Sequence, residues 1–387
     1  MAAGVSPITA RDLDARLAPL RAIGFDARRG TNRLAWTPED AAAGAWFEEQ
    51  AAACGLEAWR DAAGNRWATP RGTDGPWWAV GSHTDSVRDG GAFDGALGVA
   101  AAFAIAAVAP DDRPLAVISF EDEEGARFNT PTFGSRALTG ALADGVLDRA
   151  DDDGTTLAEA MRAAGVDPAG LPRATDNLDK LRGFYELHID QSTDLAERGA
   201  PYGVVSSLAA RLRVRATLRG VADHAGTTPM EGRQDALLAA ARLIVAANEQ
   251  AAGEMRATVG RILVEPNALT AIAAGTTAWL DARSPDSAVL DAWLARVTAA
   301  APGADLAIES RSPAVTFDDG LRALLRGAGA PEVVCWAGHD AGLLAPHVPA
   351  AMVLVRNATG ISHSPVEHVE LEDAAAGATA ILEALSA

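Results

Sequence analysis

Residues 77–86 read WWAVGSHTDS and residues 115–125 read LAVISFEDEEG, so two apolar runs each pass directly into polar and mostly acidic sequence. Between them, residues 95–109 form a helix-like stretch rich in alanine. Short buried strands separated by helices are typical of a largely parallel sheet covered on both faces. We therefore expect an α/β fold in which such a sheet forms the main domain.

Polar side chains follow three of the expected strands at the point where each strand ends. His83 and Asp85 follow the first run, four consecutive acids follow the second, and His188 stands near the end of FYELHID, residues 184–190. Asp94 lies in a glycine-rich turn before the helix-like stretch. Ligands of parallel sheets bind at the carboxyl ends of the strands. The pattern predicts a functional site at this edge of the sheet.

Four acids in a row raise the question of what offsets their mutual repulsion. Taken singly, His83 reads as a satisfied polar residue and Asp94 as a helix cap. Together with His188 and His363 they form a set of imidazoles and carboxylates without thiolate, which suits zinc, or manganese as a rival. Two cations would offset the repulsion, and Asp85 could orient His83 from behind.

The pattern changes from about Arg211 onward. Strand-like and helix-like segments follow one another in the order β-α-β-β-α-β, which is typical of a ferredoxin-like sandwich. We expect this second, α+β domain at residues 206–319, inserted into a first domain made of residues 1–205 and 320–387.

The composition excludes several classes of function. The 387 residues suffice for two domains, and the formal net charge of −19 argues against binding nucleic acid or anionic membranes. The start of the chain lacks a signal-peptide pattern, and the apolar stretches are too short to span a bilayer. The two cysteines, Cys54 and Cys335, have no ligand-like spacing. We expect a cytoplasmic location.

Seven motifs carry a family resemblance over nearly the whole chain. They are GSHTDSVRDGGAFDGALGV (81–99), EDEEGARF (121–128), ELHIDQ (186–191), DHAGTTPMEGRQDAL (223–237), LDAR (280–283), GHDA (338–341) and GISHSPVE (360–367). In order and spacing the sequence resembles the dinuclear metal amidohydrolases of the hydantoinase/carbamoylase type. This group includes N-carbamoyl-L-amino-acid hydrolases, allantoate amidohydrolases and beta-ureidopropionases, within the aminoacylase and metallo-carboxypeptidase superfamily.

The resemblance implies two divalent ions per chain, with Zn²⁺ expected and Mn²⁺ as the alternative. One ion would be held by His83, Asp94 and His188, and the other by Asp94, Glu124 and His363, so that Asp94 bridges them. Glu123 would be the general base, with Asp85 as a further catalytic group. Glu121 and Asp122 are left without a role, and we expect them to be solvated loop charges.

The resemblance also assigns roles in the second domain, which would act as a lid and a dimerisation domain. His224 would reach the active site of a neighbouring subunit, which requires a homodimer. Substrate contacts are expected from Arg283, Gln191, Thr270 and Asn267. Thr270 stands where the family usually has an asparagine, and Asp190 where it usually has a glutamate.

The expected function is metal-dependent hydrolysis of a linear amide or ureido bond in a small substrate that bears a carboxylate, such as an N-carbamoyl-L-amino acid or allantoate. A dipeptidase or an N-acyl-amino-acid deacylase of the same superfamily is an alternative. A metal-binding protein without catalysis is an alternative from another class. For His339 and Asp340, a place in the pocket wall and a purely structural role remain equally open.

Overall fold

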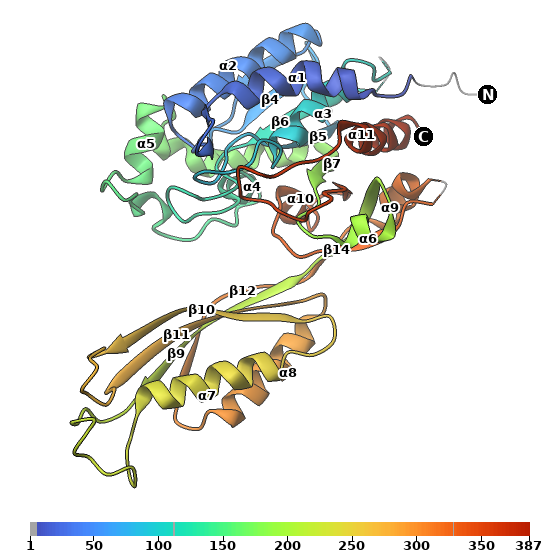
Figure 1. The fold of residues 1–387 in the computed structure, drawn as a ribbon. Helices are drawn as coiled ribbons and strands as arrows, with labels where there is room; N and C mark the ends of the chain where they lie inside the picture. The colour runs from blue at the N-terminus through green and yellow to red at the C-terminus, as the bar shows by residue number, and fades with distance from the viewer. Residues whose placement is uncertain (1–5, 111–112, 328) are drawn as a thin grey trace. The chain divides into compact units, whose positions relative to one another are not determined.

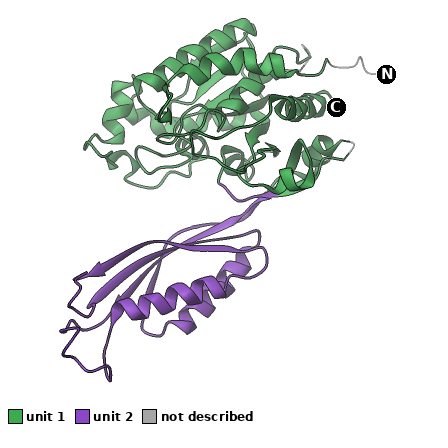
Figure 2. Ribbon diagram, in the orientation of Figure 1, with its two compact units in different colours: residues 1–206, 316–333, 338–387 green, residues 207–315, 334–337 purple. Residues whose placement is uncertain are grey.

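The structure is a computed structural model, which describes residues 6–110, 113–327 and 329–387. The chain divides into two compact units (Figure 2). Unit 1 comprises residues 1–206, 316–333 and 338–387, and unit 2 comprises residues 207–315 and 334–337. No pattern in the sequence predicted that the short segment 334–337 belongs to unit 2.

Unit 1 is a mixed α/β unit (Figure 1). Its strands are β1 (Phe25–Asp26), β2 (Gly30–Thr31), β3 (Glu57–Arg60), β4 (Arg66–Thr69), β5 (Trp77–His83), β6 (Leu115–Phe120), β7 (Leu181–Ile189), β8 (Tyr202–Leu208), β13 (Val315–Thr316), β14 (Glu332–Cys335) and β15 (Ala350–Val355). Residues of β8, β13 and β14 at the boundary are assigned to unit 2. Its α-helices are α1 (Ala10–Ala22), α2 (Pro38–Ala53), α3 (Ala96–Ala106), α4 (Phe133–Leu138), α5 (Leu157–Ala163), α6 (Asp194–Arg198), α9 (Asp319–Arg326), α10 (Asp340–Leu344) and α11 (Leu371–Ser386). Two 3-10 helices, η1 (Val146–Asp148) and η2 (Pro168–Lys180), complete it.

The main sheet has the strand order β13-β8-β15-β7-β5-β6-β4-β3, with β14 paired to β8. The four central strands, β15, β7, β5 and β6, are parallel to one another. Towards the edges, β8 pairs antiparallel with β15, and β4 and β3 continue antiparallel beyond β6. The predicted α/β fold with a largely parallel sheet is confirmed.

Helices cover both faces of this sheet (Figure 1). Apolar residues of α1, α2, α3 and α11 form one continuous core with β5, β6, β7 and β15, whereas α4 and α10 contact β6, β7 and β15 from the other side. Helix α3 is buried from Ala96 to Ile105. Its alanines favour the helix and let it lie close to the sheet. At Gly98 a Cβ atom would lie only 2.2 Å from the carbonyl oxygen of Leu187, so this position admits no side chain.

Unit 2 has the predicted order of elements. They are β9 (Ala210–Arg219), α7 (Ala236–Glu249), β10 (Arg256–Glu265), β11 (Gly275–Ser284), α8 (Ser287–Ala300) and β12 (Asp305–Ser312). The sheet is antiparallel with the strand order β10-β11-β9-β12. Buried and more exposed residues alternate along β9 and β11, which is the pattern of a sheet with one covered face. Both helices pack on that face, where Trp293 donates a hydrogen bond to the carbonyl of Ala247 (2.9 Å).

Among the helices of the described residues, none combines the length and the hydropathy that a membrane crossing requires.

Candidate metal centre

The candidate site lies in unit 1 at the carboxyl ends of the parallel strands. His83 is the last residue of β5, and His188 is the last but one of β7. The four acids follow β6 directly, and Asp94 stands just before α3. His363 lies in the segment after β15, the strand next to β7. Because these four strands are parallel neighbours, their ends bring together residues that are far apart in the sequence.

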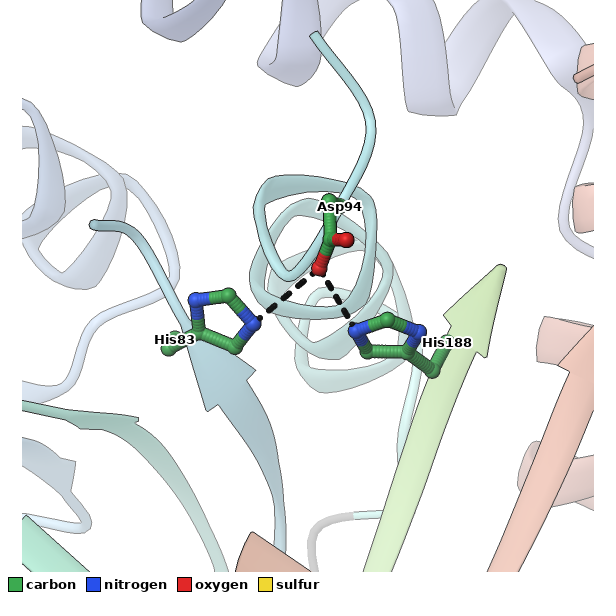
Figure 3. A group of neighbouring side chains, drawn as sticks. All are labelled: His83, Asp94 and His188. Carbon is green, nitrogen blue, oxygen red and sulfur yellow. Dashed lines mark ion pairs between the residues drawn. The ribbon is translucent and has the colours of Figure 1, made fainter. Parts of the chain in front are cut away.

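A first group of possible ligands consists of His83, Asp94 and His188 (Figure 3). Oδ1 of Asp94 lies 3.3 Å from Nε2 of His83 and 2.9 Å from Nε2 of His188. Both imidazoles are fully buried, and Asp94 is 7% exposed. The three side chains come from separate elements and point at one place.

The hydrogen bonds behind these histidines fix which ring nitrogen faces the group. Nδ1 of His83 lies 3.1 Å from the carbonyl oxygen of Asp85, and Nδ1 of His188 lies 3.1 Å from that of Ile189. A carbonyl only accepts, so Nδ1 carries a proton and Nε2 is the nitrogen that faces Asp94. Although burial opposes it, the neighbouring carboxylates, Asp94 among them, raise the pKa of both imidazoles, which favours a proton on Nε2 until a cation replaces it. Neither buried Nε2 has a hydrogen-bond partner within the described residues. Once a cation has displaced the protons on Nε2, two imidazole lone pairs and a carboxylate oxygen form a donor set that suits a divalent ion, so these residues fit a metal ion.

A second group shares Asp94 and adds Glu124 and His363. Nε2 of His363 lies 3.4 Å from Oδ2 of Asp94 and 3.4 Å from Oε2 of Glu124. The two oxygens of Asp94 therefore face different partners: Oδ1 faces the buried histidines and Oδ2 faces His363. A carboxylate divided in this way is suited to bridge two ions. The second group is the more open of the two, because the side chain of His363 is 49% exposed.

Asp85 connects the first histidine to the acidic run. Its Oδ1 and Oδ2 accept hydrogen bonds from the backbone N–H groups of Glu123 and Glu124, both at 3.1 Å. Oδ1 also lies 3.4 Å from Nδ1 of His83. A single buried carboxylate thus fixes the backbone of both glutamates while it lies behind the imidazole.

Glu123 is the acid that lies next to the first group without belonging to it. Its Oε2 is 3.8 Å from Nε2 of His83, and the residue is 7% exposed. Burial raises the pKa of Glu123, and the charge of His83 only partly opposes this effect. A carboxylate with a raised pKa is a better proton acceptor near neutral pH than an ordinary surface glutamate.

The expectation that Glu121 and Asp122 are solvated loop charges is wrong, because each is only 1% exposed. Oε2 of Glu121 forms a buried ion pair with Nη1 of Arg66 (3.1 Å), and Arg66 in turn pairs with Asp40 at 2.8 Å. The backbone N–H of Glu121 donates to the side chain of Asn65 (3.0 Å). Asp122 adopts a positive φ of 53°, where the chain turns inward. The first two acids of the run, Glu121 and Asp122, are therefore buried inside unit 1.

Without bound cations, protons take their place in this cluster. Burial, together with the charge of Asp94, raises the pKa of Glu124 to about 8. The hydrogen bond to Asp94 raises the pKa of His363 to about 9. Burial alone would raise the pKa of Asp94, but the imidazoles of His188, His363 and His83 outweigh it and hold that pKa well below its usual range. A metal ion entering the second group must therefore displace protons.

The GHDA motif lies beside the first group. The ring of His339 packs on that of His188 with a centroid separation of 4.3 Å. Burial and the charge of His188 lower the pKa of His339 well below its usual range, so the ring is neutral. Oδ1 of Asp340 accepts a hydrogen bond from Ser135 (2.5 Å). His339 thus packs directly against a member of the first group, whereas His347 and His368 belong to neither group of possible ligands.

Two residues that hold Asp94 in place were not predicted from the sequence. Glu367 is 5% exposed, and its Oε1 accepts hydrogen bonds from the backbone N–H groups of Phe93 (2.9 Å) and Asp94 (3.0 Å). The hydroxyl of Ser362 lies 2.9 Å from Oδ2 of Asp94 and 2.8 Å from Oε2 of Glu367. Both residues belong to the GISHSPVE motif, which was the only signal that could have identified them.

Gln191, an expected substrate contact, also lies at this cluster. Its Nε2 donates a hydrogen bond to Oδ2 of Asp94 (3.0 Å). Gly95, on the other side of Asp94, has a positive φ of 62°, and a Cβ atom there would lie 2.3 Å from Nε2 of His83. Only glycine leaves room for the imidazole at this position.

The other expected residues belong to unit 2. His224 pairs with Ala271 through an isolated bridge, and the backbone N–H of Ala225 donates to the carbonyl of Thr270 (2.8 Å), so His224 and Thr270 lie in neighbouring loops. Nδ1 of His224 accepts hydrogen bonds from the N–H groups of Gly226 (3.0 Å) and Thr227 (3.2 Å). The ring proton of the neutral imidazole is therefore on Nε2, which is left as a donor.

Arg283 lies near the end of β11, and two of its three nitrogens are already engaged. Nε donates to Oδ1 of Asp281 (3.1 Å), and Nη1 donates to the carbonyl of Trp336. Asn267 is exposed in the connection between β10 and β11 with a positive φ of 55°. The guanidinium is thus held in a fixed orientation by its own unit.

Comparisons with known proteins agree with the geometry. The model of the peptidase family M20/M25/M40 matches residues 71–387. The chain is 36% identical to the N-carbamoyl-L-amino acid amidohydrolase of Geobacillus stearothermophilus, over 94% of each chain, and 32% identical to the allantoate amidohydrolase of Escherichia coli K12, over 92% of this chain and 93% of that one. The solved structure of a hydantoinase/carbamoylase family amidase from Burkholderia multivorans superposes with a TM-score of 0.84 at 32% identity, covering 98% of this chain and 97% of the other. The resemblance seen in the sequence motifs is confirmed, and the chain belongs to the peptidase family M20/M25/M40.

Proposed function

We propose that this protein is an amidohydrolase that uses two divalent metal ions to cleave a linear ureido or amide bond in a small carboxylate-bearing substrate. The observation that carries the proposal is the orientation of the Asp94 carboxylate, because each of its two oxygens faces a separate group of possible ligands. The donor set contains imidazoles and carboxylates without thiolate. We expect Zn²⁺, with Mn²⁺ as the alternative.

The names of the relatives narrow the substrate class. Those at 31–36% identity include N-carbamoyl-L-amino-acid amidohydrolases and allantoate amidohydrolases. Both substrate classes combine a ureido group with a carboxylate. We propose an N-carbamoyl-L-amino acid or allantoate as the substrate; from an N-carbamoyl amino acid the products would be the free amino acid, ammonia and carbon dioxide.

In the proposed reaction, the bound ions would polarise the scissile carbonyl and lower the pKa of a water molecule from 15.7 toward about 7. His83, His188 and Asp94 would hold one ion, and Asp94, Glu124 and His363 the other. Glu123 accepts the proton of the attacking water on its carboxylate and then returns it to the leaving nitrogen. Asp85 keeps Glu123 and Glu124 in place through their backbone N–H groups.

Unit 2 would supply the groups that recognise the substrate. The Nε2–H of His224 is suited to donate to the carbonyl oxygen, because Nδ1 is already occupied as an acceptor. Arg283 would bind the substrate carboxylate with its remaining N–H groups. Thr270 and Asn267 are proposed as further contacts. A threonine hydroxyl offers one donor where an asparagine amide offers two, so Thr270 is the position at which substrate preference should differ from that of relatives with asparagine.

A substrate panel tests this function directly. Protein reconstituted with Zn²⁺ or Mn²⁺ is offered N-carbamoyl-L-amino acids, allantoate, N-acetyl-amino acids and dipeptides, and the release of ammonia or amine is measured. We expect turnover of a ureido substrate, and Thr270→Asn should change the ratio of kcat/KM between ureido substrates by roughly 10-fold, the value of one hydrogen bond. Cleavage of dipeptides or N-acetyl-amino acids alone would support a peptidase or deacylase instead. A non-catalytic metal-binding protein would turn over none of these compounds.

We also propose a homodimer formed through unit 2. Strand β10 is an edge strand of its sheet. Two consecutive residues on this strand, Ile262 and Leu263, are 40% and 51% exposed. On α7, Leu238 and Val245 are also exposed, at 49% and 53%. An edge strand next to exposed apolar side chains favours pairing with a second copy of the chain. The proposed role of His224 requires such a partner.

The dimer is tested by light scattering after size exclusion. The wild type should have twice the mass of the chain, whereas Leu238→Glu should shift it towards the monomer and lower kcat, because each His224 would lose the site it serves. Val108→Glu, at a 43% exposed position of unit 1, is the matched control and should remain dimeric. A fully active monomeric wild type would contradict the proposal.

A further inference from the structure

The segment after β15 contains one possible metal ligand, His363, and it is tightly organised around that residue. Asn357 is fully buried; its side chain donates to the carbonyl of Ile361 (2.7 Å) and accepts from the N–H groups of Thr359 and Gly360 (both 3.1 Å). These bonds close the chain into a turn just before Ser362. Ser362 and His363 are thus presented from a rigid support.

On the far side of His363, Glu367 reaches away from its own segment. Its Oε1 accepts from the backbone N–H groups of Phe93 and Asp94, and its Oε2 contacts the hydroxyl of Ser362. Gly91 makes room for this carboxylate, since a Cβ atom there would lie 2.2 Å from Oε1 of Glu367. One buried carboxylate therefore connects the segment that carries His363 with the turn that carries Asp94.

The contacts continue into the carboxylate of Asp94 itself. Ser362 lies within hydrogen-bond distance of Oδ2 of Asp94, and Gln191 donates to the same oxygen. No such donor reaches Oδ1 among the described residues, which leaves that oxygen to the histidines of the first group. The backbone of Asp94 is thus fixed by Glu367, and the rotation of its side chain is fixed through Ser362 and Gln191.

We propose that Glu367 is a positioning residue that sets the orientation of the bridging carboxylate, so that Oδ1 serves the first group of ligands and Oδ2 the second. This rests on the proposed pair of metal ions. The side chain of Glu367 forms its hydrogen bonds with the backbone of Phe93 and Asp94 and with Ser362. It acts through Ser362 and through the backbone of Asp94. Its removal should weaken the second site most, because that site takes its bridging oxygen and His363 from the two segments that Glu367 connects.

The experiment titrates metal-free full-length protein with Mn²⁺ in a calorimeter and measures the bound metal after dialysis. In Glu367→Ala, the dissociation constant of the weaker-binding ion should rise about 10- to 100-fold, the usual loss when a partner behind a ligand is removed. The tighter ion should be affected less, because His83 and His188 are held by carbonyls of their own segments.

Glu367→Gln is the conservative variant. Its side-chain oxygen can accept from both N–H groups. Its amide would donate to Ser362 where the carboxylate accepts, which leaves the single hydroxyl proton of Ser362 to Asp94, so the metal affinity should stay within a few-fold of the wild type. Glu370→Ala is the matched control in the same segment, since Glu370 is exposed and pairs only with His368 (3.3 Å). It should bind Mn²⁺ like the wild type. If Glu367→Ala does not fold, Ser362→Ala takes its place and should weaken the same ion.

The outcomes separate this inference from the proposed function. Wild-type protein that binds no metal, or only one ion, overturns the metal pair and this inference with it. Two ions in the wild type and unchanged affinities in Glu367→Ala, or in Ser362→Ala where that variant is used, overturn the positioning role alone. An equal loss in Glu367→Ala and Glu367→Gln also overturns it, because the two backbone hydrogen bonds that fix Asp94 are available to glutamine.

Discussion

Replacing Glu123 by glutamine should lower kcat by about 10²- to 10⁴-fold while both metal ions stay bound. The variant keeps the size and burial of the side chain but has no carboxylate to accept the proton of water. The backbone N–H of Glu123 would still donate to Asp85, so the acidic run keeps its path. Steady-state kinetics on the best substrate of the panel and metal analysis of the same sample measure the two effects together.

The neighbouring residue supplies the contrast. Glu124→Gln should lose metal from the second site, because its carboxylate contacts His363 in the group that would hold that ion. If Glu123→Gln retained near-normal turnover, Glu123 would not be the base. If it lost metal as Glu124→Gln is expected to, the assignment of the two glutamates would have to be exchanged.

The second large effect is expected at Asp94, the residue that both groups of ligands share. Asp94→Ala removes an oxygen ligand from each ion at once, so we expect loss of the metal pair and turnover close to background. Breaking either site singly should leave one ion bound. Elemental analysis measures the metal content of Asp94→Ala and His363→Ala. A ligand shared by both sites should cost both ions when it is removed, whereas a ligand of one site should cost one ion.

Removal of metal by a chelator tests the same metal site through the thermal stability of the protein. Ligands that bind only the folded state stabilise it, by about 4 kcal/mol when the free ion is at 1,000 times its dissociation constant. Removing metal from the wild type should therefore lower the melting temperature by several degrees, and adding metal back should restore it. In Asp94→Ala the chelator should have no effect. A wild type that melts at the same temperature with and without metal would contradict the metal site.

The position of the site could be predicted because its residues lie where parallel strands end. His83, His188 and the acidic run each follow an apolar run that is recognisable in the sequence, and the structure brings them together as that pattern implies. The burial of Glu121 could not be predicted in this way. Its partner Arg66 lies on β4, and only the pairing of β4 with β6 brings the two side chains together.

The role of Glu367 could not be predicted from the sequence either. It binds two backbone N–H groups of a distant turn, and backbone groups carry no residue-specific signal. His224, Thr270 and Arg283 differ from both cases. Their environments within unit 2 are defined, whereas the roles proposed for them involve a substrate and a partner subunit, so these roles stay predictions.

The placement of unit 2 within the chain also has a consequence for biosynthesis. His83, Asp94, Glu124 and His188 all precede unit 2, whereas His363 follows it. Strands β5, β6 and β7 pair directly with one another, and β15 is added beside β7. As the ribosome releases the chain from its N-terminus, all three residues of the first group have been synthesised before unit 2 is complete. The second group is complete only after β15 has joined the sheet and His363 has been added to it, so the two proposed metal sites would be completed in the order of translation.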